Sequence, residues 1–141
     1  IALDFGLRRI GVASGSAITG TASPLTTIAA QAGKPDWKQL DTIISDWSPD
    51  LLVLGLPYNT DGSESDMTQK VREFSEDLKA RYSLPIAFMD ERYTSAEAES
   101  ILKQQRRSGM KKRRLKKEDV DSLAAALIAQ SWLQNSTNGS D

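Results

Sequence analysis

Residues 1–16 read IALDFGLRRIGVASGS, and this stretch decides how the chain begins to fold. Residues 1–5 and 10–15 have the composition of strands, and the short turn at residues 6–9 joins them into a predicted hairpin. Asp4 interrupts the apolar run near the end of the first strand. An ionised carboxylate in such a place costs several kcal/mol unless it is paired, hydrogen-bonded or bound to a metal. Asp4 is therefore expected either to cap the turn at Gly6 or to belong to a functional site.

The rest of the chain alternates between segments typical of strands and of helices. A third strand is expected over residues 19–28, made irregular by Pro24. Capping residues, apolar spacing and breakers then predict a helix at 37–47, a strand at 51–57, a helix at 67–82, a strand at 84–91, a helix from Thr94 to near Gly109, and a last helix at 120–133.

This order predicts the α/β class, with three antiparallel strands followed by two parallel ones in a mixed five-stranded sheet flanked by helices. The 141 residues suit one domain at 1–133, followed by a polar, disordered tail at 134–141. The sequence shows neither an apolar run of membrane-spanning length nor a signal-peptide pattern, and it contains no Cys. We therefore expect a cytoplasmic protein that does not interact with membranes.

Positive charge is concentrated in one stretch. Residues 103–117 contain nine Lys or Arg and no acid, whereas the rest of the chain holds nine basic and nineteen acidic residues. Such a stretch is either a solvated loop or a contact for a polyanion such as nucleic acid. The candidate contacts are Arg106, Arg107, Lys111, Lys112, Arg113, Arg114, Lys116 and Lys117.

Carboxylates, in contrast, gather at the predicted strand ends. The chain has no His, so it cannot use a Ser-His-Asp triad or a histidine base. Asp4 ends the first strand, and Asp90 and Glu91 end the last. Ligands bind at that edge of open α/β sheets. Because successive strand residues face opposite sides, at most one of Asp90 and Glu91 can share a site with Asp4.

A third acid comes from the last helix. Asp121 lies on the same helical row as Ala125, Ile128 and Trp132, which should face the sheet. Three converging acids without His or Cys suit one or two hard cations, Mg²⁺ or Mn²⁺, and a two-metal mechanism needs no protein base. In the competing interpretation the acids are structural, with Glu91 paired to a nearby cation.

Four motifs extend this interpretation. The stretches LDFGLRRIGVASG (3–15), LGLPYNTDGSES (54–65), MDERYTSAEA (89–98) and DVDSLAAALI (119–128) resemble those of the YqgF family. Its members are described as Holliday-junction-resolvase-like proteins and as nucleases of pre-16S ribosomal RNA. The resemblance implies a ribonuclease H-like fold, metal-dependent phosphodiester cleavage, and catalytic metal ligands at Asp4, Glu91 and Asp121, with Asp90 a weaker candidate. Related nucleases carry a fourth acid where this chain has Gly55, which leaves the number of ions open.

Further motif residues have two interpretations each. Arg8, Arg9 and Arg92 are candidates for phosphate contacts or for surface ion pairs. Asn59, Asp61 and Gly62 form a loop near the expected site, where Asx-turn chemistry would explain them equally well. Gly6 and Gly11 are expected to let the hairpin turn tightly and the substrate backbone approach.

We therefore expect a metal-dependent nuclease that processes the 5′ end of precursor 16S ribosomal RNA during ribosome biogenesis. Its partners would be structured RNA and ribosomal particles, and the chain would act as a monomer or a homodimer. The alternatives are a dimeric resolvase of four-way DNA junctions and a non-catalytic RNA-binding assembly factor. The stretch DFGLRRIG also resembles a phosphate motif of actin-like ATPases, but those proteins need a second domain for which 141 residues leave no room.

Overall fold

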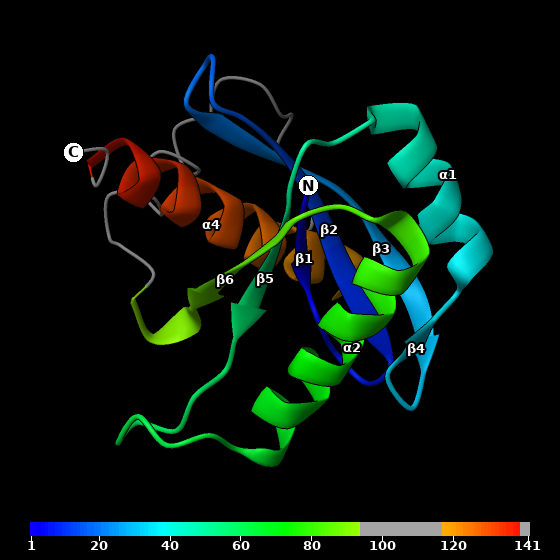
Figure 1. Cartoon of the computed structure of the whole chain (residues 1–141), viewed down its shortest axis with the longest axis vertical. Coiled ribbons are helices and arrows are strands. Elements are labelled where there is room, and N and C mark those ends of the chain that lie inside the picture. Colours follow the sequence, from blue (N-terminus) through cyan, green and yellow to red (C-terminus); the bar gives the residue numbers. More distant parts are fainter. Residues whose placement is uncertain (94–116, 139–141) are drawn as a thin grey trace.

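The structure is a computed structural model, and it describes residues 1–93 and 117–138. Within these residues, six strands form one mixed sheet in the order β4-β3-β2-β1-β5-β6 (Figure 1). The strands are β1 (Ala2–Asp4), β2 (Arg9–Ser16), β3 (Thr21–Gln31), β4 (Lys34–Pro35), β5 (Leu52–Leu56) and β6 (Ile86–Asp90). β1, β2 and β3 pair antiparallel, whereas β5 runs parallel to both β1 and β6. The predicted order of antiparallel and parallel strands is confirmed.

The sixth strand, β4, was not predicted. Ala32 and Gly33 both have positive φ angles, 51° and 84°, and turn the chain back against the end of β3. Pro35 then pairs with Ala30, and the next residue, Asp36, caps the following helix. A strand of two residues is too short to leave a periodic pattern in the sequence, which is why five strands were expected.

The helices that the structure describes are α1 (Trp37–Trp47), α2 (Asp66–Tyr82) and α4 (Lys117–Asn138), with a 3₁₀ turn η1 (Glu91–Tyr93) after β6. The helix expected from Thr94 to Gly109 lies outside the described residues. α4 continues to Asn138 and so takes in residues 134–138, which were expected to belong to a polar tail. Asn135 explains part of this extension, because its side-chain amide contacts the sulfur of Met89 on β6 at 3.6 Å.

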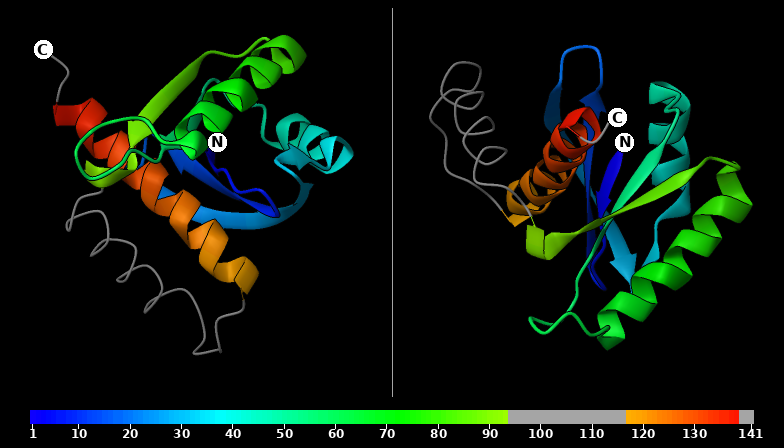
Figure 2. Two further views of the ribbon diagram at one scale, coloured as in Figure 1. Left: turned by 90° about the horizontal axis from the view of Figure 1, so that it is seen from below. Right: turned by 60° about the vertical axis from the view of Figure 1, so that its left-hand side comes forward.

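The sheet has a different partner on each face. α1 and α2 cover one face and α4 crosses the other, as Figure 2 shows. Leu3, Ile10 and Leu54 belong to the core under α1 and α2. Ala2 and Met89 pack instead toward α4, together with the helix residues Ile128 and Ala129. Strand residues alternate between the two faces, so this assignment also fixes the direction of the polar residues at the strand ends.

The face under α4 is lined by small residues. Ala13, Ala125 and Ala126 form a buried cluster between β2 and the helix. The buried Gln130 fastens the helix to the β2–β3 hairpin, since it accepts a bond from the Ala22 amide at 3.1 Å and donates one to the Gly20 carbonyl at 2.8 Å. No helix among the described residues has both the length and the apolar character needed to cross a membrane.

Candidate active site

Asp4 lies at the end of β1 on the face that α4 covers, because Ala2 faces that helix and Leu3 faces away. Its neighbours in the sheet are both glycines. Gly11 is its register partner on β2, and Gly55 comes one residue after the Leu3–Leu54 pair on β5. The two glycines leave room beside Asp4, and each space is filled by an element that carries another acid.

The space over Gly11 is filled by the main chain of α4. A Cβ atom at Gly11 would lie 2.0 Å from the carbonyl oxygen of Asp121, so the helix backbone rests directly on β2 at this point. The contact brings Asp121 to the end of β1 that carries Asp4, and the predicted inward row is seen in the buried Ala125 and Ile128 below it. Gly11 therefore serves the approach of the helix, not the turn or the substrate approach expected from the sequence.

The space over Gly55 is filled by the side chain of Glu91. A Cβ atom at Gly55 would lie 2.5 Å from Glu91 Oε1 and 2.6 Å from Ile128 Cδ1. A larger residue there would collide with both as they lie, so the position has no room for a fourth acid while Glu91 keeps its place. The sequence shows that Gly55 stands where related nucleases carry an acid. It does not show that the side chain of Glu91 packs against Gly55, because that contact is visible only in the structure.

Asp4 and Glu91 meet as a pair of carboxyl groups joined by a hydrogen bond. Burial, the charge and hydrogen bond of Glu91, and the charge of Asp121 together raise the pKa of Asp4 to about 7. Burial and the charge of Asp90 also raise the pKa of Glu91, against a lowering by its bond to Asp4. Two carboxylates that share one site resist being ionised together, so either a proton or a cation would relieve the repulsion between them.

Asp121 completes the group of three acids but is turned toward a cation of the chain. Arg9 Nε donates a hydrogen bond to Asp121 Oδ2 at 2.8 Å. Among residues 1–93 and 117–138, no three acidic side chains are placed so that they could hold a metal ion as they stand. The expected meeting of three acids is thus a close pair, Asp4 and Glu91, with Asp121 near enough to affect the pKa of Asp4.

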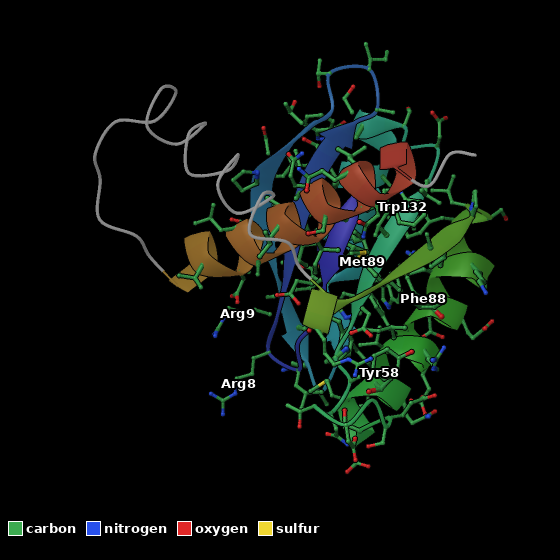
Figure 3. All side chains as sticks on the ribbon, turned by 90° about the vertical axis from the view of Figure 1, so that its left-hand side faces the viewer. Arg8, Arg9, Tyr58, Phe88, Met89 and Trp132 are labelled. Carbon is green, nitrogen blue, oxygen red and sulfur yellow. The ribbon has the colours of Figure 1, made fainter. Side chains whose placement is uncertain are left out.

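Asp90 forms an ion pair with Arg92 and does not join Asp4 and Glu91. The guanidinium donates to both Asp90 oxygens, with Nη2–Oδ2 at 2.7 Å and Nε–Oδ1 at 3.2 Å, and it lowers the pKa of Asp90. On β6, Phe88 packs toward α1 and α2 whereas Met89 packs toward α4 (Figure 3). Continuing that alternation puts Glu91 on the α4 face and Asp90 on the other, in agreement with the expectation that only one of the two would accompany Asp4.

Arg92 also contacts the loop after β5. Its guanidinium lies 5.3 Å from the centre of the Tyr58 ring, and a Cβ atom at Gly62 would be 3.3 Å from Arg92 Nη1. Within the loop, the amide and hydroxyl of Ser63 donate to Asp61 Oδ1 at 2.9 and 2.6 Å, and Asn59 Nδ2 donates to the Ser63 hydroxyl. Asx-turn chemistry therefore accounts for Asn59 and Asp61, and a φ of 90° accounts for Gly62.

Arg8 and Arg9, the two arginines between β1 and the start of β2, differ in the direction of their side chains. Arg9 lies beside the first turns of α4, whereas Arg8 points away from the fold into solvent (Figure 3). Within the described part of the chain, the Arg8 guanidinium has no ion-pair partner. The basic candidates Arg106, Arg107, Lys111, Lys112, Arg113, Arg114 and Lys116 lie outside the described residues, and Lys117 is described only as the first residue of α4.

The chemistry of the donors fits a divalent cation. Asp4 and Glu91 present carboxylate oxygens, the ligands that Mg²⁺ and Mn²⁺ prefer, and a partly buried acid with a pKa raised to about 7 lacks a compensating positive charge. Asp121 could join them once its carboxylate leaves Arg9. A cation held there would relieve the repulsion between the two carboxylates.

Comparison with known proteins gives a consistent picture. The sequence pattern of the RuvX family, described as "Holliday junction resolvase", matches residues 1–135. A Haemophilus ducreyi protein named "Putative pre-16S rRNA nuclease" is 47% identical over 135 residues, which are 96% of this chain and 95% of the relative. A Glaesserella parasuis protein of the same name is 46% identical over 134 residues, which are 95% and 94% of the two chains. The resemblance that the four motifs indicated is confirmed.

Two solved structures are similar in fold. Thermus thermophilus RuvC in complex with a Holliday junction substrate gives a TM-score of 0.55 at 12% identity, covering 96% of this chain and 94% of that one. A second Thermus thermophilus RuvC structure gives 0.54 at 14% identity, covering 96% and 95%. At such low identity the likeness concerns the fold alone, and it confirms the predicted α/β, ribonuclease H-like class.

Proposed function

This chain belongs to the RuvX family, and on that premise we propose that it is a metal-dependent nuclease that hydrolyses phosphodiester bonds. The observation that carries the proposal is the hydrogen-bonded pair of Asp4 and Glu91 under the start of α4, with Asp121 beside it. A half-buried pair of acids without a compensating charge is costly in the cation-free protein, and a bound cation would offset that cost.

Each acid has a role in this proposal. Asp4 and Glu91 would hold the cation through their carboxylate oxygens, and Asp121 would be the third ligand. Mg²⁺ or Mn²⁺ bound there would supply an activated water and stabilise the leaving oxygen. Asp90 would remain paired with Arg92 and take no part. The chain has no His, so its own side chains offer no general base with an ordinary pKa near neutrality.

We propose precursor 16S ribosomal RNA as the substrate, cut near its 5′ end in the cytoplasm during ribosome assembly. The names of the relatives at 46–47% identity support this choice. The description of the family favours a second candidate, cleavage of four-way DNA junctions. Arg8, with an exposed side chain at the sheet end that carries the acids, and the basic stretch at 103–117 are the proposed contacts for nucleic acid phosphates.

The test is a cleavage assay with two substrates in one preparation, a precursor 16S transcript and a synthetic four-way DNA junction, each with Mn²⁺ or with EDTA. We expect cleavage of the RNA only with Mn²⁺. Asp4→Asn and Glu91→Gln should each slow it by at least about 100-fold, because losing a metal ligand should cost no less than losing a hydrogen-bond partner of a ligand, which costs about 10–100-fold. Asp90→Asn is the matched control and should cut at nearly the normal rate.

The other outcomes each point to a different conclusion. Normal cleavage by both Asp4→Asn and Glu91→Gln would show that the assigned site is wrong. Preferential cleavage of the junction would favour the second candidate. Binding of the transcript without cleavage of either substrate would instead indicate a non-catalytic assembly factor.

A further inference from the structure

Asp121, the third acid, forms an ion pair with Arg9, and among the described residues no three acids are placed together for a metal ion. We propose that Arg9 is a positioning residue that holds Asp121 away from the Asp4–Glu91 pair until a nucleic acid phosphate takes its guanidinium. In this arrangement, the cation site is completed only when the substrate is present. The inference rests on the proposed function and adds a control of when the site can form.

The main chain of Asp121 is fixed, so the orientation of its side chain is the only freedom left. The helix backbone rests on Gly11, where a Cβ atom would lie 2.0 Å from the Asp121 carbonyl oxygen. The direction of the carboxylate is therefore set by its partner, and that partner is Arg9 Nε, which donates to Oδ2 at 2.8 Å. Releasing this single hydrogen bond would free the carboxylate without any movement of the helix.

The ion pair is accessible enough to be exchanged. The side chain of Arg9 is 42% exposed and that of Asp121 is 29% exposed. Ion pairs at such exposure are weak, because water solvates both partners. A phosphodiester can replace the carboxylate as the partner of Arg9, since a guanidinium matches the geometry of both groups.

Position also favours Arg9 over its neighbour. Arg9 begins β2 and its backbone pairs with Ala29 of β3, so the base of its side chain is held beside the start of α4 (Figure 3). Arg8 points away from the fold into solvent (Figure 3) and has no ion-pair partner among the described residues. Both residues carry one positive charge next to the site, but Arg9 alone of the two occupies an oxygen of the third acid.

A guanidinium on Asp121 and a divalent cation near Asp4 compete, because both are positive and both are attracted to the same carboxylate. Nucleic acid that draws Arg9 away would therefore tighten cation binding. Thermodynamic linkage requires that the cation tighten nucleic acid binding by the same factor. Removal of the guanidinium should raise the cation affinity and abolish this linkage.

The experiment measures Mn²⁺ binding to the whole chain by calorimetry, with and without a phosphorothioate RNA stem-loop that resists hydrolysis. For the wild type, we expect the RNA to tighten Mn²⁺ binding. Arg9→Gln should bind Mn²⁺ about fivefold more tightly than the wild type without RNA, the scale of an exposed ion pair, and should gain little more from RNA. Arg9→Lys, which keeps the charge, should lie between the two.

Arg8→Gln is the matched control, since it removes the same charge one residue away. It should bind the RNA more weakly, bind Mn²⁺ as the wild type does without RNA, and keep the linkage. If Arg9→Gln and Arg8→Gln bind Mn²⁺ equally without RNA, the positioning role of Arg9 is overturned while the proposed nuclease stands. If the wild type binds no Mn²⁺ with or without RNA, both the inference and the proposed cation site fail. Circular dichroism of each variant verifies that the fold is retained.

Discussion

Gly11 lies directly beneath the main chain of Asp121, at a distance that leaves no room for a single additional carbon. Gly11 is also the register partner of Asp4, so one close contact sets the position of the last helix relative to the first strand. The acids of the candidate site come from three separate segments of the chain. Their meeting depends on this contact and on the corresponding one at Gly55.

The first prediction concerns the contact at Gly11. Gly11→Ala would place a carbon 2.0 Å from the Asp121 carbonyl oxygen, which is backbone and cannot rotate away. We expect the free energy of unfolding to fall by about 2–4 kcal/mol, the scale of severe overpacking, and the cleavage rate to fall as the helix moves.

Gly15→Ala is the control on the same strand. A Cβ there would make ordinary contacts, the nearest being Leu133 Cδ1 at 3.4 Å, Ala129 Cβ at 3.6 Å and Ala22 Cβ at 3.9 Å. Urea denaturation should therefore show a change within about 1 kcal/mol of the wild type. Equal effects of the two variants would contradict a special role for Gly11.

The second prediction concerns the contact at Gly55. A Cβ at this position would collide with the end of the Glu91 side chain, which can rotate, and with Ile128. Gly55→Ala should therefore cost less stability than Gly11→Ala, about 1–3 kcal/mol, but should separate Glu91 from Asp4. We expect the cleavage rate to fall by at least about 10-fold, because a displaced ligand misplaces the reacting groups.

Two measurements test this distinction, the melting temperature and the cleavage rate with Mn²⁺. A Gly55→Ala protein that is as active as the wild type would show that Glu91 does not need its observed position. The control is again Gly15→Ala, which should change neither quantity by much.

The sequence was sufficient to predict the order of the longer strands, the helices α1, α2 and α4, and the placing of Asp4 beside one of the two acids after Met89. The choice of Glu91 over Asp90 came from the resemblance to the YqgF family. Strand alternation predicted only that one of the two would accompany Asp4, and the apolar row on the last helix predicted that Asp121 faces the sheet. These periodicities depend on the backbone alone, so they are visible without a structure.

Other features depend on contacts that no local pattern records. The turn at Ala32 and Gly33 that forms β4, and the extension of α4 along Met89, arise from tertiary packing. The pairing of Arg9 with Asp121 joins residues 112 positions apart in the sequence. From the sequence, Gly55 marks only the absence of a fourth acid. Its role in making room for Glu91 depends on where the side chain of Glu91 lies.

The third prediction concerns Arg92 and the loop after β5. Arg92→Gln should free Asp90 and loosen the loop, because the guanidinium contacts Asp90, Tyr58 and the backbone near Gly62. Within the loop, the Asn59 amide donates to the Ser63 carbonyl and the Gly62 amide to the Asn59 carbonyl, both at 2.9 Å. Hydrogen exchange of these two amides, followed by NMR, should become faster.

Arg72→Gln provides the comparison, because Arg72 reaches the same Tyr58 through its hydroxyl at 3.1 Å and also pairs with Glu64. This variant removes a contact to the loop but leaves Asp90 and Arg92 in place. In Arg72→Gln the pKa of Asp90 should stay low. In Arg92→Gln the pKa of Asp90 should rise toward its ordinary value, because the guanidinium that lowers it is gone. Unchanged exchange in Arg92→Gln would mean that the loop holds its shape without the arginine.

The fourth prediction concerns the stability of the cation-free protein as a function of pH. The pKa of Asp4 is about 7 in the folded protein, against an ordinary value of 3.8. Between about pH 4 and pH 7 the folded state therefore binds more protons than the unfolded chain, and the free energy of unfolding falls as the pH rises through this window. Asp4→Asn removes the charge and should make the EDTA-treated protein more stable at pH 8, by on the order of 1–3 kcal/mol.

Asp61 should show the opposite sign, because the bonds from Ser63 lower its pKa. Asp61→Asn should therefore destabilise the protein at pH 8, where the favourable charged form is lost, and have less effect under acid conditions. Adding Mn²⁺ at pH 8 should stabilise the wild type more than Asp4→Asn, since a ligand that binds only the folded state raises the free energy of unfolding. Chemical denaturation at pH 5 and pH 8, with EDTA and with Mn²⁺, measures the effect of Asp4→Asn, the effect of Asp61→Asn and the stabilisation by Mn²⁺. A wild type that is more stable at pH 8 than at pH 5 in EDTA, together with no gain from Asp4→Asn, would mean that Asp4 bears no unrelieved charge in the folded protein.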